Sequence, residues 1–204
     1  KDFNGTISFI ITGDEEADSV NGVKKVVKWL KENNIRIDGS IATESSSEKV
    51  IGDQIKVGRK GAVDVQIEII GKQGHAAYPQ LAQNPLHCMS KLISFFDDQK
   101  LDDGAEYFEP STLQFTQINL NNKAKNVIPE KLITVGDMRF NDNWDQAKIQ
   151  NYFDKHLTKI CSENSCKYNL KLTFRGMPFQ AFDNPFTKHC IKAIKDVTGL
   201  EASQ

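Results

Sequence analysis

The chain has 204 residues, with 26 basic against 27 acidic side chains and a formal net charge of -1 at pH 7. This length suits one large domain or two small ones. The balanced charge excludes a basic field that would attract nucleic acid or a membrane surface, and no apolar run approaches the roughly 18 residues that span a bilayer. We therefore expect a globular protein without nucleic-acid or membrane partners.

The four cysteines, at positions 88, 161, 166 and 190, do not form the pattern of a disulfide framework. Cys161 and Cys166 are separated by four residues, which is not a usual spacing for zinc ligands. The first residues also lack the apolar segment of a signal peptide. These features predict reduced thiols in a cytoplasmic protein.

Residues 1–58 have the pattern of an α/β domain. The apolar run over residues 6–12 predicts a buried strand, and Asn21-Gly22 then begins an amphipathic helix. Residues 35–43 predict the next strand. A strand–helix–strand unit of this kind implies a parallel βαβ crossover, so we expect residues 1–58 to form part of a larger domain with a parallel sheet.

Acidic side chains follow both of these predicted strands. Glu15 and Glu16 come directly after the first strand, and Glu44 follows the second. Because parallel strands end at the same edge of a sheet, these carboxylates are expected to lie close together. There they could bind a metal or transfer a proton, although solvated turn residues or helix caps would give the same pattern.

The pattern changes after residue 58. Residues 63–69 alternate strictly between apolar and polar side chains, which predicts a strand with one wet face in an antiparallel sheet. Asn84-Pro85 is the expected start of a helix. The strand over residues 113–120 loses its alternation at Thr116-Gln117, which predicts a β-bulge.

The remaining elements complete a second, inserted domain. Residues 131–140 predict a strand, residues 149–160 an amphipathic helix and residues 168–174 a final strand. The order from 62 to 175 is then β-α-β-β-α-β, the α+β ferredoxin-like pattern. We place this inserted domain at residues 59–177, with 178–204 returning to the first domain.

Two side chains of the inserted domain are candidate site residues. His75 lies among two glycines, an aromatic and a proline just past a strand end, where it could donate to a developing oxyanion, bind a metal or simply be a surface loop histidine. Arg139 ends a strand, and its planar guanidinium suits a substrate carboxylate. An ion pair with Asp137 or Asp142 is the alternative for this arginine.

Three further residues are ambiguous in the same way. Asn126 stands just before a strand, where it could contact a substrate or make a turn. Arg59 and Lys60 flank the predicted junction between the domains, where they could bind an anionic group or be solvated at a hinge.

Taken together, these features resemble the M20 family of metallopeptidases and amidohydrolases. The resemblance runs through nearly the whole chain, in order and at compatible spacing. The stretches that carry it are residues 12–17, 43–46, 58–61, 73–79, 81–85, 110–114 and 126–129.

The resemblance implies a dinuclear zinc amide hydrolase that acts on a small molecule as a homodimer through residues 59–177. Glu15 would be the general base, Glu16 and Glu44 would each bind one zinc ion, and cobalt would also fit these ligands. His75 would stabilise the oxyanion in the partner subunit's site. The positions expected around the substrate are Arg59, Tyr78, Asn126 and Arg139.

The chain also departs from the family pattern. The family's His-x-Asp motif would lie before Lys1 and its last histidine ligand after Gln204, so we expect a fragment that does not retain both zinc ions. Lys125 replaces a residue that is often asparagine. A non-catalytic dimerisation module, pairing through an exposed edge strand or helix, is the alternative for the isolated chain.

Overall fold

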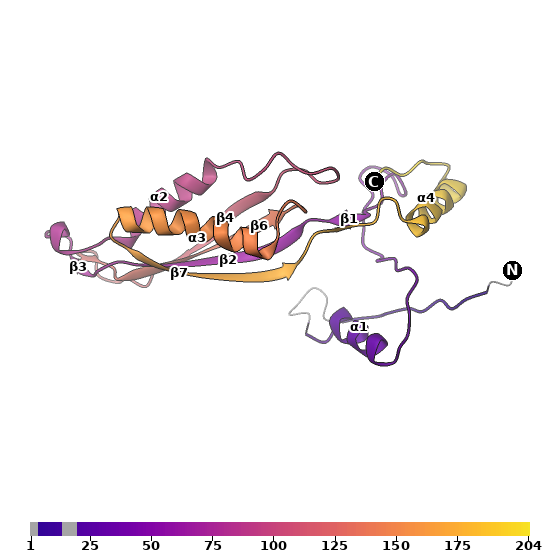
Figure 1. Ribbon diagram of the computed structural model, residues 1–204, viewed down its shortest axis with the longest axis horizontal. Coiled ribbons are helices and arrows are strands. Elements are labelled where there is room, and N and C mark those ends of the chain that lie inside the picture. The colour runs from indigo at the N-terminus through magenta and orange to yellow at the C-terminus, as the bar shows by residue number, and fades with distance from the viewer. Residues whose placement is uncertain (1–3, 14–19) are drawn as a thin grey trace. The chain divides into compact units, whose positions relative to one another are not determined.

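The computed structural model describes residues 4–13 and 20–204, and the chain divides into two compact units, Lys1–Ser45 and Ser46–Gln204. The larger unit is built on a four-stranded antiparallel sheet with the strand order β4-β6-β2-β7 (Figure 1). The strands are β2 (Gly61–Ile70), β4 (Thr112–Asn119), β6 (Lys131–Phe140) and β7 (Lys167–Gly176).

Two helices cover one face of this sheet (Figure 1): α2 (Pro85–Asp97) and α3 (Gln146–Glu163). The long elements follow each other in the predicted β-α-β-β-α-β order. Asn84 caps α2 as predicted, because its side-chain oxygen accepts a hydrogen bond from the Leu86 amide at 3.0 Å. Asp145 caps α3 in the same way through the Lys148 amide.

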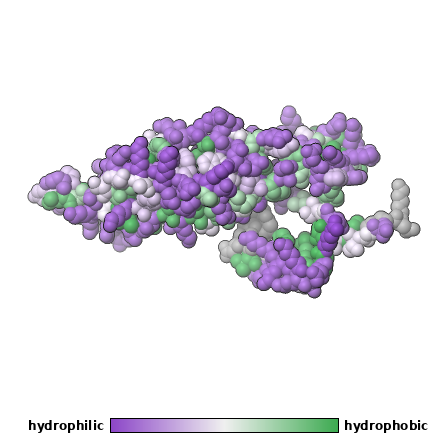
Figure 2. Space-filling view, in the orientation of Figure 1, coloured by the Kyte–Doolittle hydropathy of each residue, from purple (hydrophilic) through white to green (hydrophobic). Residues whose placement is uncertain are grey.

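The core lies between the sheet and these helices. Alternate residues of β2 point toward the helices and are fully buried, while their neighbours line the open face. The visible surface of this domain is mostly hydrophilic with scattered apolar residues (Figure 2). The largest fully buried apolar side chains of the described residues are Val63, Val65, Ile67, Ile69, Leu92, Leu132, Met138, Phe140, Ile149, Phe153 and Leu157.

The bulge predicted in β4 is confirmed. The pairing of β4 with β6 shifts register between Phe115 and Gln117, which leaves Thr116 without a direct partner on the neighbouring strand. The buried Thr134 hydroxyl donates to the Gln117 carbonyl oxygen at 2.7 Å across this irregularity. The hydrogen bond satisfies a polar group that the sheet would otherwise bury unpaired.

The smaller unit departs from the prediction. Helix α1 (Val23–Glu32) forms, but the segments 6–12 and 35–43 are not strands, so no parallel βαβ unit is present in the part of this unit that the structure describes. Apolar side chains such as Phe9 (87% exposed) and Ile11 (94% exposed) remain open to solvent. Two short strands do not make a stable sheet without further strands or a covering layer, which explains why the apolar pattern alone was not sufficient.

The chain enters and leaves the sheet domain along a short antiparallel pair, β1 (Gly58–Arg59) with β8 (Phe179–Gln180). Helix α4 (Pro185–Thr198) follows and is capped by Asn184, whose side-chain oxygen accepts the Phe186 amide. The predicted domain limits at residues 59 and 177 fall beside this pair and stay a prediction. Within the described ranges, no helix is long and apolar enough to cross a membrane.

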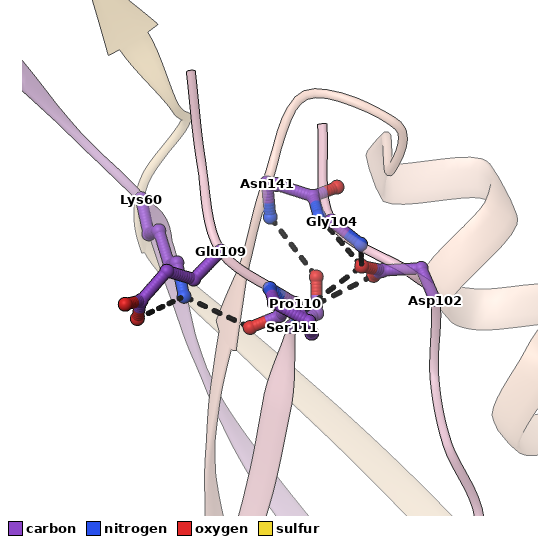
Figure 3. Close-up of polar contacts among 7 residues, drawn as sticks. All are labelled: Lys60, Asp102, Gly104, Glu109, Pro110, Ser111 and Asn141. Carbon is purple, nitrogen blue, oxygen red and sulfur yellow. Dashed lines mark hydrogen bonds and ion pairs between the residues drawn. The ribbon is translucent and has the colours of Figure 1, made fainter. Parts of the chain in front are cut away.

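A polar loop between α2 and β4 is organised around one carboxylate, Asp102 (Figure 3). Asp102 accepts hydrogen bonds from the Gly104 amide at 2.8 Å, from Asn141 Nδ2 at 2.7 Å and from Trp144 Nε1 at 2.7 Å. Burial opposes ionisation of Asp102, but the hydrogen bonds from Ser111, Trp144 and nearby backbone amides outweigh it and lower its pKa to about 2. The loop is therefore fixed to the end of β6.

The same loop also reaches the junction with β1 and β8. Lys60 Nζ donates to the Pro110 carbonyl oxygen at 2.8 Å (Figure 3), and the ring of Tyr107 stacks on Phe182 with centroids 4.4 Å apart. The loop thus contacts the chain just after it enters the domain and just after it leaves.

Candidate functional site

A short antiparallel pair of strands at one end of the sheet brings together three of the residues expected at the site. Strand β3 (Gly74–His75) pairs with β5 (Val127–Ile128), with His75 opposite Val127. The Ala76 amide donates to the Asn126 carbonyl oxygen at 2.9 Å. His75 and Asn126, which are far apart in the sequence, therefore lie side by side.

The imidazole of His75 is held in a defined orientation. Its Nδ1 accepts a hydrogen bond from the Ala77 amide at 3.0 Å, so the neutral ring carries its proton on Nε2. Asn126 Nδ2 lies 3.4 Å from this Nε2 atom, and because an amide nitrogen only donates, the Asn126 amide accepts the Nε2 proton only when it is turned over so that its oxygen faces the ring. Because His75 is exposed, an incoming oxyanion could take the place of Asn126 as the acceptor.

Tyr78 completes this group. Its ring centroid lies 5.7 Å from that of His75, and its amide donates to the His75 carbonyl oxygen at 2.9 Å, which closes the turn. Tyr78 is 57% exposed, so its ring is available to a ligand. The three candidates His75, Tyr78 and Asn126 form what we call the tip cluster.

The tip cluster rests on a backbone that tolerates no side chain at Gly71. A Cβ atom there would lie 2.1 Å from the Gln83 carbonyl oxygen. That carbonyl oxygen accepts the Lys72 amide at 2.9 Å, and the Gln83 amide returns a bond to Lys72 at 3.0 Å. This close approach ties the start of the His75 loop to the segment before α2.

Sequence reasoning missed a second support of the tip. Asn122 Nδ2 donates to the Val127 carbonyl oxygen at 2.9 Å and holds the loop before β5. Beside this loop is an open hollow of about 620 Å³ whose lining includes Gln73, Asn119 and Glu130. The asparagine-rich run over residues 119–122 was the available signal, because asparagine side chains often brace turns.

Arg59 and Arg139 lie at the other end of the sheet. Arg139 pairs with Ala62 across β2 and β6, whereas the tip follows the opposite end of β2 (Figure 1). The ten residues of β2 rise about 3.3 Å each, which separates the two groups by about 30 Å. One copy of the chain therefore does not bring all four substrate-binding candidates together.

The two arginines differ in whether their charge is paired with a carboxylate. Arg139 Nε donates to Asp137 Oδ1 at 2.6 Å, which is the ion pair that the sequence left open. The Cζ atom of Arg59 lies 6.0 Å from the Phe179 ring centroid, and no acidic side chain of the described chain forms an ion pair with Arg59. Arg59 is the arginine with an uncommitted charge, and a substrate contact from Arg139 stays a prediction.

Asp137 is the centre of an ion-pair network on the open face of the sheet. Burial opposes its ionisation, but hydrogen bonds from Arg139 and Arg175 outweigh this and lower the pKa of Asp137. Arg175 also pairs with Asp64, with Nε and Oδ1 3.1 Å apart. The sequence pattern did not reveal Arg175, because its partners lie on two neighbouring strands.

The acidic candidates are not assembled in the described chain. Glu15 and Glu16 lie outside the described residues, and Glu44 is an exposed side chain of the smaller unit. In residues 4–13 and 20–204, no group of three or more histidine, cysteine, aspartate or glutamate side chains could hold a metal ion. The described residues therefore do not fit a zinc site by themselves, since zinc takes three or four protein ligands.

Comparison with known proteins identifies the family to which the chain belongs. Residues 57–165 match the family model of the peptidase dimerisation domain found in M20 proteins. The chain therefore belongs to the M20 family, as its motifs indicated.

Curated relatives of the chain include enzymes that share one name. The chain is 36% identical over 200 residues to succinyl-diaminopimelate desuccinylase of Orientia tsutsugamushi (strain Ikeda), covering 98% of this chain and 50% of that protein. It is 38% identical over 198 residues to the enzyme of the same name from Bradyrhizobium diazoefficiens, covering 97% and 51%. The chain spans about half the length of these relatives.

Solved structures support the fold. A tripeptidase from Staphylococcus aureus matches 71% of this chain and 37% of its own, with a TM-score of 0.58 and 21% identity. An aminopeptidase PepT from Bacillus cereus matches 74% and 39%, with a TM-score of 0.59 and 15% identity. At these identities the likeness concerns the fold alone.

Proposed function

We propose that this chain is the central part of a metal-dependent amide hydrolase that removes succinate from N-succinyl-LL-2,6-diaminopimelate. The products are succinate and LL-diaminopimelate, a step of bacterial lysine and peptidoglycan biosynthesis. The names of the curated relatives support the substrate. The observation that carries the proposal is the tip cluster, in which a rigidly oriented histidine presents an N–H donor at an exposed tip.

His75 donates its Nε2 proton in a hydrogen bond to the oxyanion of the tetrahedral intermediate. Such a donor is effective because its orientation is set before the reaction, so no reorganisation is needed when charge develops. Asn126 and Tyr78 lie beside the His75 ring, where a substrate would contact them.

The site is shared between two copies of the chain. Arg59 and Arg139 lie about 30 Å from the tip cluster along β2, too far for one small substrate to reach both. A homodimer formed through residues 59–177 would bring the two groups together, because His75 of the partner subunit would enter the site that contains the arginines of the first copy. The uncommitted guanidinium of Arg59 would then bind a substrate carboxylate.

The metal belongs to the proposal as well. Glu16 and Glu44 would each bind one of two zinc ions, with cobalt as an alternative metal. When bound, the metal would polarise the amide carbonyl and lower the pKa of water. Glu15 would accept the proton of that water and pass it to the leaving amine.

A complementation experiment tests the shared site in the full-length protein. The variants Glu15→Gln and His75→Asn are purified separately, unfolded, mixed in equal amounts and refolded. Half of the dimers then contain one subunit of each variant. Each of these dimers holds one site that combines an intact Glu15 with an intact His75 of the partner subunit. We expect about a quarter of the wild-type rate from the mixture and almost none from either variant alone.

His87 is the matched control, because it is an exposed histidine on α2 of the same domain. His87→Asn should keep the full rate. No recovery in the mixture, with both variants dimeric, would contradict a site shared across the dimer. A normal rate for His75→Asn would contradict the role of His75 itself.

The substrate is tested separately. Another M20 amidohydrolase, such as an acetylornithine deacetylase or an aminoacylase, is the alternative. Turnover of N-succinyl-diaminopimelate and of N-acetylornithine by the full-length protein distinguishes these, because a hydrolase prefers the acyl group that its pocket fits. Faster turnover of N-acetylornithine would exclude the desuccinylase.

The 204-residue chain is expected to be inactive alone and to act at most as a dimerisation module. Equilibrium dialysis at neutral pH followed by metal analysis should find almost no tightly bound zinc, because two carboxylates are too few ligands. Two zinc ions per chain would contradict the assignment of Glu16 and Glu44 as its only ligands.

A further inference from the structure

Three cysteines meet in the core where α2, α3 and the start of β7 come together. Cys88 lies on α2, Cys161 on the last turn of α3 and Cys166 just before β7. Their exposed fractions are 0%, 2% and 8%. The fourth thiol, Cys190 on α4, is more exposed and lies outside this group, which we call the thiol cluster.

The fold holds the thiol cluster in contact. Cys88 Sγ lies 3.8 Å from Cys161 Sγ, so the two helices present their sulfur atoms directly to each other. After α3 ends, Ser165 takes a left-handed conformation with φ of 54°, and the Cys166 amide donates to the Cys161 carbonyl oxygen at 2.9 Å. This tight turn returns the chain so that Cys166 lies beside the pair.

We propose that Cys88 and Cys161 form an intrachain disulfide under oxidising conditions and thereby join α2 to α3 covalently. A disulfide needs two cysteines on segments that run close together, and the contact between the two sulfur atoms places α2 and α3 in this relation. Closing the bond shortens the sulfur–sulfur distance from 3.8 Å to about 2 Å, which side-chain rotation and a small helix shift supply.

The oxidant is a peroxide. The Cys161 thiolate attacks one peroxide oxygen and the oxygen–oxygen bond breaks, which leaves a sulfenic acid on Cys161. The hydroxide that departs takes up a proton and becomes the first water. The Cys88 sulfur then attacks this sulfenic sulfur, and a second water leaves. Two thiols and one hydrogen peroxide thus give one disulfide and two waters, so atoms and electrons balance.

The thiol cluster favours Cys161 as the first sulfur to react. The hydrogen bond that Cys88 donates lowers the pKa of the Cys161 thiol and raises that of the Cys88 thiol. Burial raises the pKa of Cys166 to about 11, which disfavours its thiolate at neutral pH. Reaction requires a local opening of the core, so the bond should form slowly in the folded protein.

The test uses the 204-residue chain carrying Cys190→Ser, which removes the accessible thiol. Hydrogen peroxide is added at neutral pH, and free thiols, disulfide-linked peptides and Tm are followed over time. We expect the free thiols to fall from three to one, a linked pair of peptides that contain Cys88 and Cys161, and a rise in Tm on the order of 10 °C. Dithiothreitol should reverse all three changes.

Two further variants keep the test decisive. Cys161→Ala should abolish both the linked peptides and the rise in Tm, whereas Cys166→Ala should retain them, with folding of each checked by circular dichroism before oxidation. A link to Cys166 in place of either partner would overturn the proposal. Irreversible oxidation without a disulfide, or three thiols that persist after local opening in mild urea, would overturn it as well.

Discussion

Replacing Asp102 with asparagine should destabilise the sheet domain measurably. In the native structure one carboxylate oxygen accepts from Trp144 Nε1 at 2.7 Å and the other from Asn141 Nδ2 at 2.7 Å and from backbone amides. The amide of Asp102→Asn keeps one acceptor but presents a donor on its other side. A donor then faces a donor, and one charge-assisted hydrogen bond is lost.

The magnitude follows from the pKa and from the hydrogen bonds. Lowering the pKa of Asp102 from 3.8 to about 2 corresponds to roughly 2.4 kcal/mol, at about 1.4 kcal/mol per unit. Because the side chain is only partly buried, solvent screening reduces this to about 1–2 kcal/mol. Adding the unpaired donor, we expect Asp102→Asn to lower the free energy of unfolding by about 2–3 kcal/mol at pH 7.

The pH dependence has a definite sign. The folded-state pKa of Asp102 lies below its unfolded value of 3.8, so its contribution is complete above that pH and is lost as the pH falls toward about 2. By pH 3 about half of it should be gone. The stability gap between wild type and Asp102→Asn should therefore narrow between pH 5 and pH 3.

Urea unfolding followed by Trp144 fluorescence measures the stability difference between wild type and Asp102→Asn. A Trp29→Phe background removes the other tryptophan, so that the signal comes from the sheet domain only. The neighbouring Asp103, whose side chain is 90% exposed, is the matched control, and Asp103→Asn should change stability by less than about 0.5 kcal/mol. A gap for Asp102→Asn below about 0.5 kcal/mol at pH 7, or one that stays constant down to pH 3, would refute the reasoning.

Three other changes test separate parts of the structure. Phe153→Ala removes a fully buried ring and should lower the free energy of unfolding in urea by about 3–5 kcal/mol; a loss below 1 kcal/mol would mean that the core is not packed as described. Gly71→Ala places a Cβ 2.1 Å from the Gln83 carbonyl oxygen, so protection of the Lys72 amide from hydrogen exchange should fall, and unchanged protection would contradict this close approach. Lys131→Met removes the hydrogen bond that lowers the pKa of Glu68, so an NMR titration should find that pKa raised, and no change would exclude the ion pair in solution.

The sheet domain was the part of the fold that the sequence pattern predicted well. Strict alternation in β2 identified its buried face, and the slip at Thr116 located the bulge. Asn84 was found as a helix cap because this signal is local and depends on neighbouring residues only. Local patterns suffice where an element buries one face against elements of the same domain.

The apolar segments of the smaller unit were misjudged for the opposite reason. A strand needs a hydrogen-bonded neighbour, and neither apolar content nor the intervening helix α1 supplies one. The apolar pattern over residues 6–12 indicates that these side chains tend to be buried, but it does not indicate whether a neighbouring strand is present to pair with them.

Among the polar residues, local patterns likewise identified some single positions but not the contacts between distant ones. The glycine-rich loop marked His75, but only the pairing of β3 with β5 places Asn126 beside it. The role of Asp102 was missed, because its partners Asn141 and Trp144 lie about 40 residues away and share no periodic pattern with it. Arg139 fitted a substrate and an ion pair equally well until the Asp137 carboxylate was located.

The pairing of β1 with β8 bears on how such a protein could have arisen. Because Gly58 lies opposite Gln180, the points of entry and exit are a single strand spacing apart. A segment of more than a hundred residues could therefore be gained, lost or exchanged between genes while the remaining chain is closed by a short turn. Recombination at these two positions would move the sheet domain and its tip cluster as one unit and leave the path of the remaining chain unchanged.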